Sequence, residues 1–179
     1  LIEEAPKELK QAAKKRTVGL IGAGTMGRGI AQVSAQTGYN VIMIDRHEEI
    51  ARKSLAKIDT LLSKTTKEDV KREILGRIKI TTNFYDLVHA DLVIEALTED
   101  MELKKEVLKE LENECSREAI FATNTSSLSI YELSQVLEDQ SRLVGLHFFN
   151  PVPRMKLVEI VRSKNTSDRV VEFAKEVAT

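Results

Sequence analysis

The sequence predicts an α/β fold in which helices cover both faces of a mostly parallel, doubly wound sheet. Two features carry this prediction. Short apolar runs alternate with amphipathic stretches from Thr17 onward, and a glycine-rich turn joins the first strand to the first helix. Length and composition agree, because 179 residues with 42% hydrophobic and 31% charged residues suffice for one ordinary globular domain.

The first strand–helix unit surrounds the glycine-rich turn. Thr17–Ile21 is an apolar run of strand length, and helical spacing begins at about Thr25 and ends near Gly38. Between them, Gly22, Gly24 and Gly27 form a G-x-G-x-x-G pattern. The first glycine of such a pattern makes the tight turn, the second admits a pyrophosphate, and the third lets the helix pack closely on the strand. The helix N-terminus would then face the phosphates with its free N–H groups.

A second strand strengthens the prediction of a dinucleotide site. Asn40–Ile44 ends at Asp45, about twenty residues beyond the glycines, where the ribose 2′-hydroxyl needs an acceptor. We expect Thr25 and Met26, in the glycine-rich loop, to contribute as well. Asp45 would repel a 2′-phosphate and favours NAD over NADP, although Arg46 would attract that phosphate. The structural alternative is a glycine-rich turn beside a surface aspartate.

The rest of the chain continues the alternation, with one insertion. Apolar positions predict a helix over residues 48–63 and a second helix capped by Thr66 and ended by Gly76, which together form a hairpin protruding from the sheet. Further strands are expected at residues 78–81, 91–95, 119–123, 142–147 and 155–161, and helices at 104–115, at 130–137 and after Ser167. The complete pattern predicts a Rossmann-type, doubly wound sheet with a helical hairpin insertion.

Composition limits the partners and the location. Residues 1–16 are polar and predict a linker or N-terminal arm before a nucleotide-binding domain at residues 17–179. Three glutamates in this arm argue against a mitochondrial transit peptide. A net charge of -1 and the absence of long apolar runs predict no nucleic-acid or membrane partner. The single cysteine, Cys115, excludes an internal disulfide. We expect a cytoplasmic protein, with an organellar matrix as the alternative, and no metal site.

The most specific motifs lie in the second half of the chain. They are Asn124-Thr-Ser-Ser127, His147-Phe-Phe-Asn-Pro-Val-Pro153 and Met155-Lys-Leu-Val-Glu159, accompanied by Glu95-Ala-Leu-Thr-Glu-Asp100. With the glycine-rich loop, they closely resemble the L-3-hydroxyacyl-CoA dehydrogenases. The resemblance implies NAD-dependent oxidation of L-3-hydroxyacyl-CoA to 3-ketoacyl-CoA, a step of the fatty-acid β-oxidation type. It also implies a helical domain after Thr179 that completes the substrate cleft, carries a catalytic asparagine and makes a homodimer.

Three residues are candidates for the chemistry. Oxidising an alcohol with NAD needs a base, and histidine suits this role because imidazole titrates near neutrality. His147 ends one strand and Glu159 lies twelve residues later, so a hairpin-like return would bring them within about 2.6–3.2 Å. Ser126 would donate to the substrate oxygen, and the resemblance assigns the same three roles. Otherwise His147 would be structural, Glu159 would face solvent, and Ser126 would cap the helix near Ser129.

The resemblance also implies further contacts to the cofactor and to coenzyme A. Glu99 and Lys104 would line the ribose and nicotinamide, which Asn150 and Ser126 would also reach. Glu99 and Lys104 would otherwise be ordinary charges at a helix start. The family holds coenzyme A at the helical hairpin, whose loop is here reduced to Lys64-Thr-Thr-Lys67, so these lysines are only candidates.

Two other functions stay open. A dehydrogenase of a free hydroxy acid or sugar acid would keep the His147–Glu159 pair without needing the coenzyme A hairpin. A crystallin-like nucleotide-binding or structural module without turnover would have no use for the catalytic set.

Overall fold

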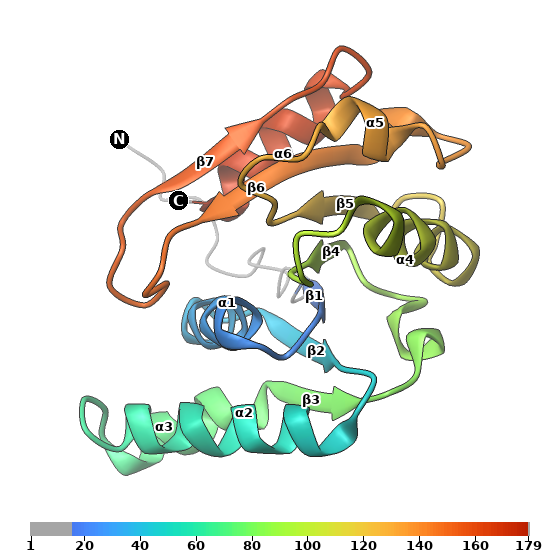
Figure 1. The fold of residues 1–179 in the computed structure, drawn as a ribbon. Coiled ribbons are helices and arrows are strands. Elements are labelled where there is room, and N and C mark those ends of the chain that lie inside the picture. The colour runs from blue at the N-terminus through green and yellow to red at the C-terminus, as the bar shows by residue number, and fades with distance from the viewer. Residues whose placement is uncertain (1–15, 179) are drawn as a thin grey trace, which may run out of the picture.

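One seven-stranded sheet organises the computed structural model, which describes residues 16–178 (Figure 1). Its order is β3-β2-β1-β4-β5-β6-β7, and every neighbouring pair is parallel except β6 and β7. This is the doubly wound, Rossmann-type arrangement that the sequence predicts, and its strand order reverses between β1 and β4. Of the predicted arm, only Arg16 lies within the described residues, and its guanidinium pairs with Glu176 at 2.9 Å.

The elements follow the predicted alternation. The strands are β1 (Thr17–Ile21), β2 (Asn40–Ile44), β3 (Ile78–Thr81), β4 (Leu92–Glu95), β5 (Ile120–Thr123), β6 (Leu143–Phe148) and β7 (Val158–Val161). The α-helices are α1 (Thr25–Gln36), α2 (Glu48–Leu62), α3 (Glu68–Gly76), α4 (Met101–Glu114), α5 (Ile130–Ser134) and α6 (Asp168–Ala178). Two 3₁₀ helices, η1 (Phe84–Leu87) and η2 (Gln140–Arg142), were not predicted because each is a single turn without a full apolar period.

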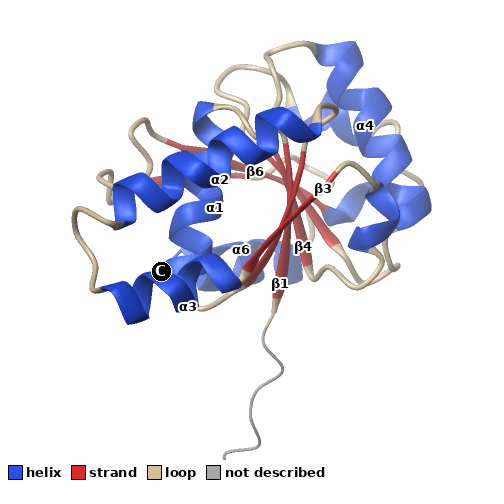
Figure 2. Ribbon diagram, turned by 90° about the horizontal axis from the view of Figure 1, so that it is seen from below, coloured by secondary structure: helices blue, strands red, loops and turns tan. Residues whose placement is uncertain are grey.

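Helices pack on both faces of the sheet and enclose two apolar cores. α1, α2, α3 and α6 lie on one side and α4 on the other (Figure 2). Leu20, Ile30 and Val170 are fully buried in the first core. Leu108 of α4 and Leu133 of α5 are fully buried in the second. The central parallel strands β1, β4 and β5 are therefore buried on both faces, which is why they appear as nearly continuous apolar runs in the sequence.

The helical hairpin differs from the prediction in two ways. Ile58 and Leu62 of α2 are fully buried in the first core, so α2 packs beside α1 instead of protruding. Thr66 is not the cap of α3. Its N–H donates to Leu62 O at 2.8 Å, which extends the last turn of α2, and Lys67 takes the N-cap position without a side-chain hydrogen bond.

Candidate functional site

The glycine-rich loop has the geometry that its pattern predicts. Gly22 has φ +96°, a conformation that favours glycine, and its N–H donates to Ile44 O at 2.8 Å. A Cβ added to Gly27 would lie 1.8 Å from Gly22 O, so only glycine lets α1 approach the end of β1 this closely. The predicted mechanical roles of Gly22 and Gly27 are confirmed.

The N-terminus of α1 is open beside this turn. Gly24 is its N-cap, and a Cβ added there would have no neighbouring atom within 4 Å. No side chain in the described part of the chain caps α1. Thr25 is exposed and Met26 partly exposed at the start of the helix. An uncapped helix end with free space in front of its N–H groups fits a pyrophosphate.

Asp45 lies between this loop and a cavity of about 680 Å³, here called the Asp45 cavity. Its Oδ2 accepts from Ala23 N at 2.9 Å, and its Oδ1 accepts from His47 N at 3.1 Å. The cavity is also lined by Gly22, Arg46, Phe84 and Leu97. Three glutamates of α4, Glu106, Glu110 and Glu114, also line it. Apolar groups beside the Asp45 carboxylate fit the adenosine half of a dinucleotide, and the residues present therefore fit NAD.

His147 and Glu159 form a pair across the antiparallel strands β6 and β7. They are direct neighbours in the register, and His147 Nδ1 lies 2.9 Å from Glu159 Oε2, so the predicted distance is confirmed. An ionised carboxylate only accepts hydrogen bonds, so Nδ1 carries the hydrogen and Nε2 of the neutral ring keeps its lone pair. The Phe149 ring packs against the imidazole with its centroid 4.5 Å away.

Four further predicted residues meet His147 around one cavity of about 310 Å³, here called the His147 cavity. They are Met26, Glu99, Ser126 and Asn150, from the start of α1, the β4–α4 loop, the β5–α5 loop and the β6–β7 loop. Leu97 lines both this cavity and the Asp45 cavity, so the two adjoin along the carboxyl ends of the strands. Ligands of doubly wound sheets bind at this edge.

The carboxylate of Glu99 accepts several hydrogen bonds from the loop after β5. Its Oε1 accepts from Thr125 Oγ1 at 2.7 Å, from Ser126 N at 2.8 Å and from Ser126 Oγ at 3.1 Å. Burial acts to raise the pKa of Glu99, but these hydrogen bonds and the charge of Lys104 outweigh it and lower the pKa to about 2. Ser126 therefore does not cap α5; Ser129 does, accepting from Glu132 N at 3.2 Å.

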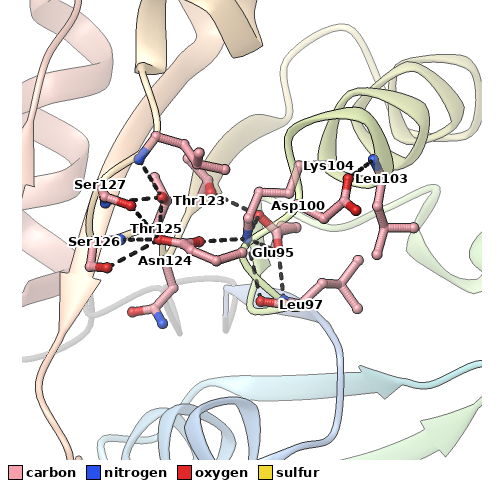
Figure 3. A network of polar contacts seen from close by, with 12 residues as sticks. Glu95, Leu97, Asp100, Leu103, Lys104, Thr123, Asn124, Thr125, Ser126 and Ser127 are labelled. Atoms are coloured by element: carbon pink, nitrogen blue, oxygen red, sulfur yellow. Dashed lines mark hydrogen bonds and ion pairs between the residues drawn. The ribbon is translucent and has the colours of Figure 1, made fainter.

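Lys104 lines neither cavity. Its side chain is fully buried, and Nζ lies 2.7 and 2.9 Å from the two carboxylate oxygens of Glu95 (Figure 3). Lys64 and Lys67 are exposed on the hairpin loop and line neither cavity. The structure therefore places none of these three lysines in the lining of either cavity.

Sequence reasoning missed two supporting residues. Asn124 Oδ1 accepts from Phe148 N at 2.8 Å and so ties the end of β5 to the backbone that follows His147. Glu95 is buried at the end of β4. The sequence contains a signal for it, because an acid at the end of an apolar strand is seldom buried without a partner.

Other reactive groups stand apart from the site. Burial raises the pKa of the Cys115 thiol to about 11, as expected for a packed side chain. Within residues 16–178, no group of three or more His, Cys, Asp or Glu side chains is placed to hold a metal ion. None of the helices in that range has the length and apolar character needed to cross a membrane.

Comparisons with known proteins agree on one family. Residues 17–179 match the family model described as "3-hydroxyacyl-CoA dehydrogenase, NAD binding domain". A 3-hydroxybutyryl-CoA dehydrogenase of Clostridioides difficile is 44% identical over 167 residues, which cover 88% of this chain and 59% of the relative. The mitochondrial hydroxyacyl-coenzyme A dehydrogenase of Sus scrofa is 41% identical over 175 residues, covering 90% of this chain and 56% of the relative.

A solved structure gives the same result for the fold. The 3-hydroxybutyryl-CoA dehydrogenase of Escherichia coli superimposes with a TM-score of 0.89 at 37% identity, covering 92% of this chain and 36% of that one. The chain thus spans little more than half the length of the two sequence relatives.

Proposed function

Because the chain belongs to the 3-hydroxyacyl-CoA dehydrogenase family, as its NAD-binding domain, we propose that it forms the nucleotide half of an enzyme that oxidises L-3-hydroxyacyl-CoA to 3-ketoacyl-CoA. One observation supports the proposal: His147, which pairs with Glu159 at 2.9 Å, borders the same cavity as Ser126 and Asn150. A nucleotide site alone has no need for a base that is paired and aimed in this way.

The residues that would hold NAD follow from the two cavities. The open turn at Gly24 and the start of α1 would take the pyrophosphate, and Asp45 would accept from the adenosine ribose. Glu99 and Asn150 would lie on the nicotinamide side. When bound, the nicotinamide supplies a hydride acceptor for the alcohol carbon.

His147 would act as the base. Its Nε2 would take the proton from the substrate hydroxyl, while Glu159 holds the ring by Nδ1 and stabilises the imidazolium that forms. The cross-strand register fixes both side chains on one face of the β6–β7 pair. This orientation would present Nε2 to the substrate hydroxyl.

Ser126 would bind the substrate oxygen. Its hydroxyl donates to Glu99 in this structure at 3.1 Å, while its N–H also donates to Glu99 at 2.8 Å. The backbone contact can therefore hold the loop while the hydroxyl turns toward the substrate. Such a turn costs one exposed hydrogen bond, on the order of 1 kcal/mol.

The remaining parts of the enzyme are proposed from the family. They are the acyl-CoA partner, a homodimer and the catalytic asparagine. We propose that the dimer surface and the asparagine lie in the region that the relatives have beyond this chain. A cytoplasmic location stays a prediction, with an organellar matrix as its alternative, and one relative is named as a mitochondrial protein. A dehydrogenase of free hydroxy acids and a crystallin-like module remain the rival functions.

Ligand binding separates these readings. The chain is titrated with NADH and with acetoacetyl-CoA, separately and together, by fluorescence and calorimetry. The proposal expects binding of NADH and tighter binding of acetoacetyl-CoA when NADH is present. Binding of NADH with no response to acetoacetyl-CoA, in this chain and in a chain extended to the relatives' full length, would refute the acyl-CoA substrate.

A further inference from the structure

Glu95 and Lys104 form a fully buried charge pair at the carboxyl end of β4 (Figure 3). Burying a charge is costly unless it is paired and hydrogen-bonded, and this pair meets both conditions. Glu95 accepts from Lys104 Nζ with both oxygens, from Leu97 N at 2.5 Å and from Thr123 Oγ1 at 2.7 Å. The carboxylate thus joins β4, β5, the β4–α4 loop and α4 at a single point.

The pair holds Leu97 by both of its backbone groups. Glu95 Oε1 accepts from Leu97 N, and Lys104 Nζ lies 3.4 Å from Leu97 O. Leu97 lines both the Asp45 cavity and the His147 cavity. A Cβ added to Gly22 would lie 2.9 Å from Ala96 O and 3.1 Å from the Leu97 side chain. The segment that the pair fixes is therefore in direct contact with the glycine-rich turn.

Lys104 also reaches the catalytic side. Its Nζ lies 3.6 Å from Glu99 Oε2, the carboxylate that gathers Thr125 and Ser126. One buried ammonium thus faces two carboxylates, one fully buried and one at the surface of the cavity. If Glu95 lost its charge, the ammonium would keep only Glu99 as a counter-ion and would pull it away from Ser126.

We propose that Glu95 is a positioning residue of the NAD site, which acts through Lys104 to fix Leu97 and Glu99 as the wall beside the glycine-rich loop. Neither Glu95 nor Lys104 needs to touch the nucleotide for this role. The proposal concerns cofactor binding alone, so it stands or falls independently of turnover of an acyl-CoA.

Three variants test it: Glu95→Leu, Lys104→Met and the double variant. Glu95→Leu leaves a buried ammonium without its main partner and should destabilise the fold. The double variant replaces both charged side chains with apolar ones of similar size, so its stability should recover, because well-packed apolar groups often replace buried ion pairs without loss. Its NADH affinity should not recover, because Leu97 and Glu99 would still lack their contacts with Glu95 and Lys104. We expect a loss of more than about fivefold in NADH affinity, a typical coupling within one polar network.

Glu112→Gln supplies the matched control. Glu112 lies on α4, as Lys104 does, and pairs with the buried Arg142 at 2.7 Å. Neither Glu112 nor Arg142 lines either cavity. This variant should lose stability and keep its NADH affinity. Affinities are measured by NADH fluorescence and referred to the folded fraction from circular dichroism. A folded double variant that loses about fivefold or less, or an equal loss in Glu112→Gln, would overturn the positioning role.

Discussion

At the scale of single residues, Asp45 serves both the glycine-rich loop and the choice of cofactor. It accepts from Ala23 N, and its carboxylate borders the Asp45 cavity. We expect NADH to bind at least about tenfold more tightly than NADPH, a difference of about 1.4 kcal/mol, because the carboxylate repels a 2′-phosphate. Asp45→Ala should erase most of this preference in fluorescence titrations.

Asp45→Asn is the matched control, because its amide oxygen can still accept from Ala23 N while the charge is gone. It should keep much of the NADH affinity and lose the discrimination against NADPH. Equal affinities for the two nucleotides in the unmodified chain would contradict the role of Asp45.

The role proposed for the His147–Glu159 pair predicts that its variants lose turnover but keep their affinity for NADH. In a chain extended to the relatives' length, His147→Gln should lower kcat by about 10²–10⁴ with little change in NADH affinity. Glu159→Gln should be milder, because it keeps the shape of the pair and removes its charge. Steady-state kinetics and NADH titration are the measurements, and the exposed His89→Gln is the control. A normal kcat in His147→Gln would exclude this base.

Glu99 makes stability depend on pH in a defined window. Its pKa is lowered from 4.5 to about 2 in the folded chain. The folded state therefore binds fewer protons than the unfolded state between these values, so the stabilisation is present above about pH 4.5 and is lost as the pH falls toward about 2. Glu99→Gln should flatten this part of the profile in urea unfolding followed at several pH values. An unchanged acid limb in the variant would contradict the contacts of Glu99.

Residues differ in how far the sequence could predict them. His147 and Glu159 were predictable, because a hairpin return between two extended runs brings matched positions together. The buried state of Lys104 was not, because a lysine near a helix start resembles any surface charge. Its burial depends on how α4 packs against the end of β4, and local sequence does not show this tertiary packing.

At the scale of elements, the β1–α1 unit carries a testable contrast between two glycines. A Cβ at Gly27 would meet the backbone oxygen of Gly22, whereas a Cβ at Gly24 would meet no described atom. Gly27→Ala should therefore destabilise the fold by about 1–3 kcal/mol, as overpacking does, and weaken NADH binding. Gly24→Ala should leave stability nearly unchanged and still weaken NADH binding, because the methyl group enters the space proposed for the pyrophosphate.

Urea unfolding and NADH fluorescence give the two readouts for this contrast. Equal stability of both variants would mean that α1 adapts to the added methyl group. Unchanged NADH affinity in Gly24→Ala would mean that the nucleotide does not approach the turn.

The period of the apolar residues predicts most of the helices and strands, but it predicts their ends less well. The seven strands are short apolar runs bounded by polar residues, so their existence follows from local sequence. Thr66 was wrongly predicted as a cap, because backbone bonds from α2 continue through it. The packing of α2 on α1 was also missed, because an amphipathic pattern shows which face is buried but not which partner covers it.

At the scale of the whole molecule, the carboxyl edge of the sheet gathers every part of the proposed site. Six loops reach the two cavities, while two separate cores below them hold the strands. The chain therefore contains the apolar surface needed to bury its own strands, and we expect it to fold and bind NADH as it stands. The side chain of Glu159 is nevertheless 54% exposed, which is unusual for the partner of a catalytic base. More protein should cover this pair in an active enzyme.

The last prediction follows from that exposure and from the length of the relatives. This chain should turn over 3-hydroxybutyryl-CoA several powers of ten more slowly than a chain extended by about a hundred residues, a usual length for a small domain. Positioning alone contributes about 7–11 kcal/mol in well-oriented reactions, and one wall of a cleft supplies only part of it. NADH affinity should be similar in the two chains, because both cavities lie within the described residues. Comparable kcat/KM values would show that the substrate cleft is complete here and that no second domain takes part in the chemistry.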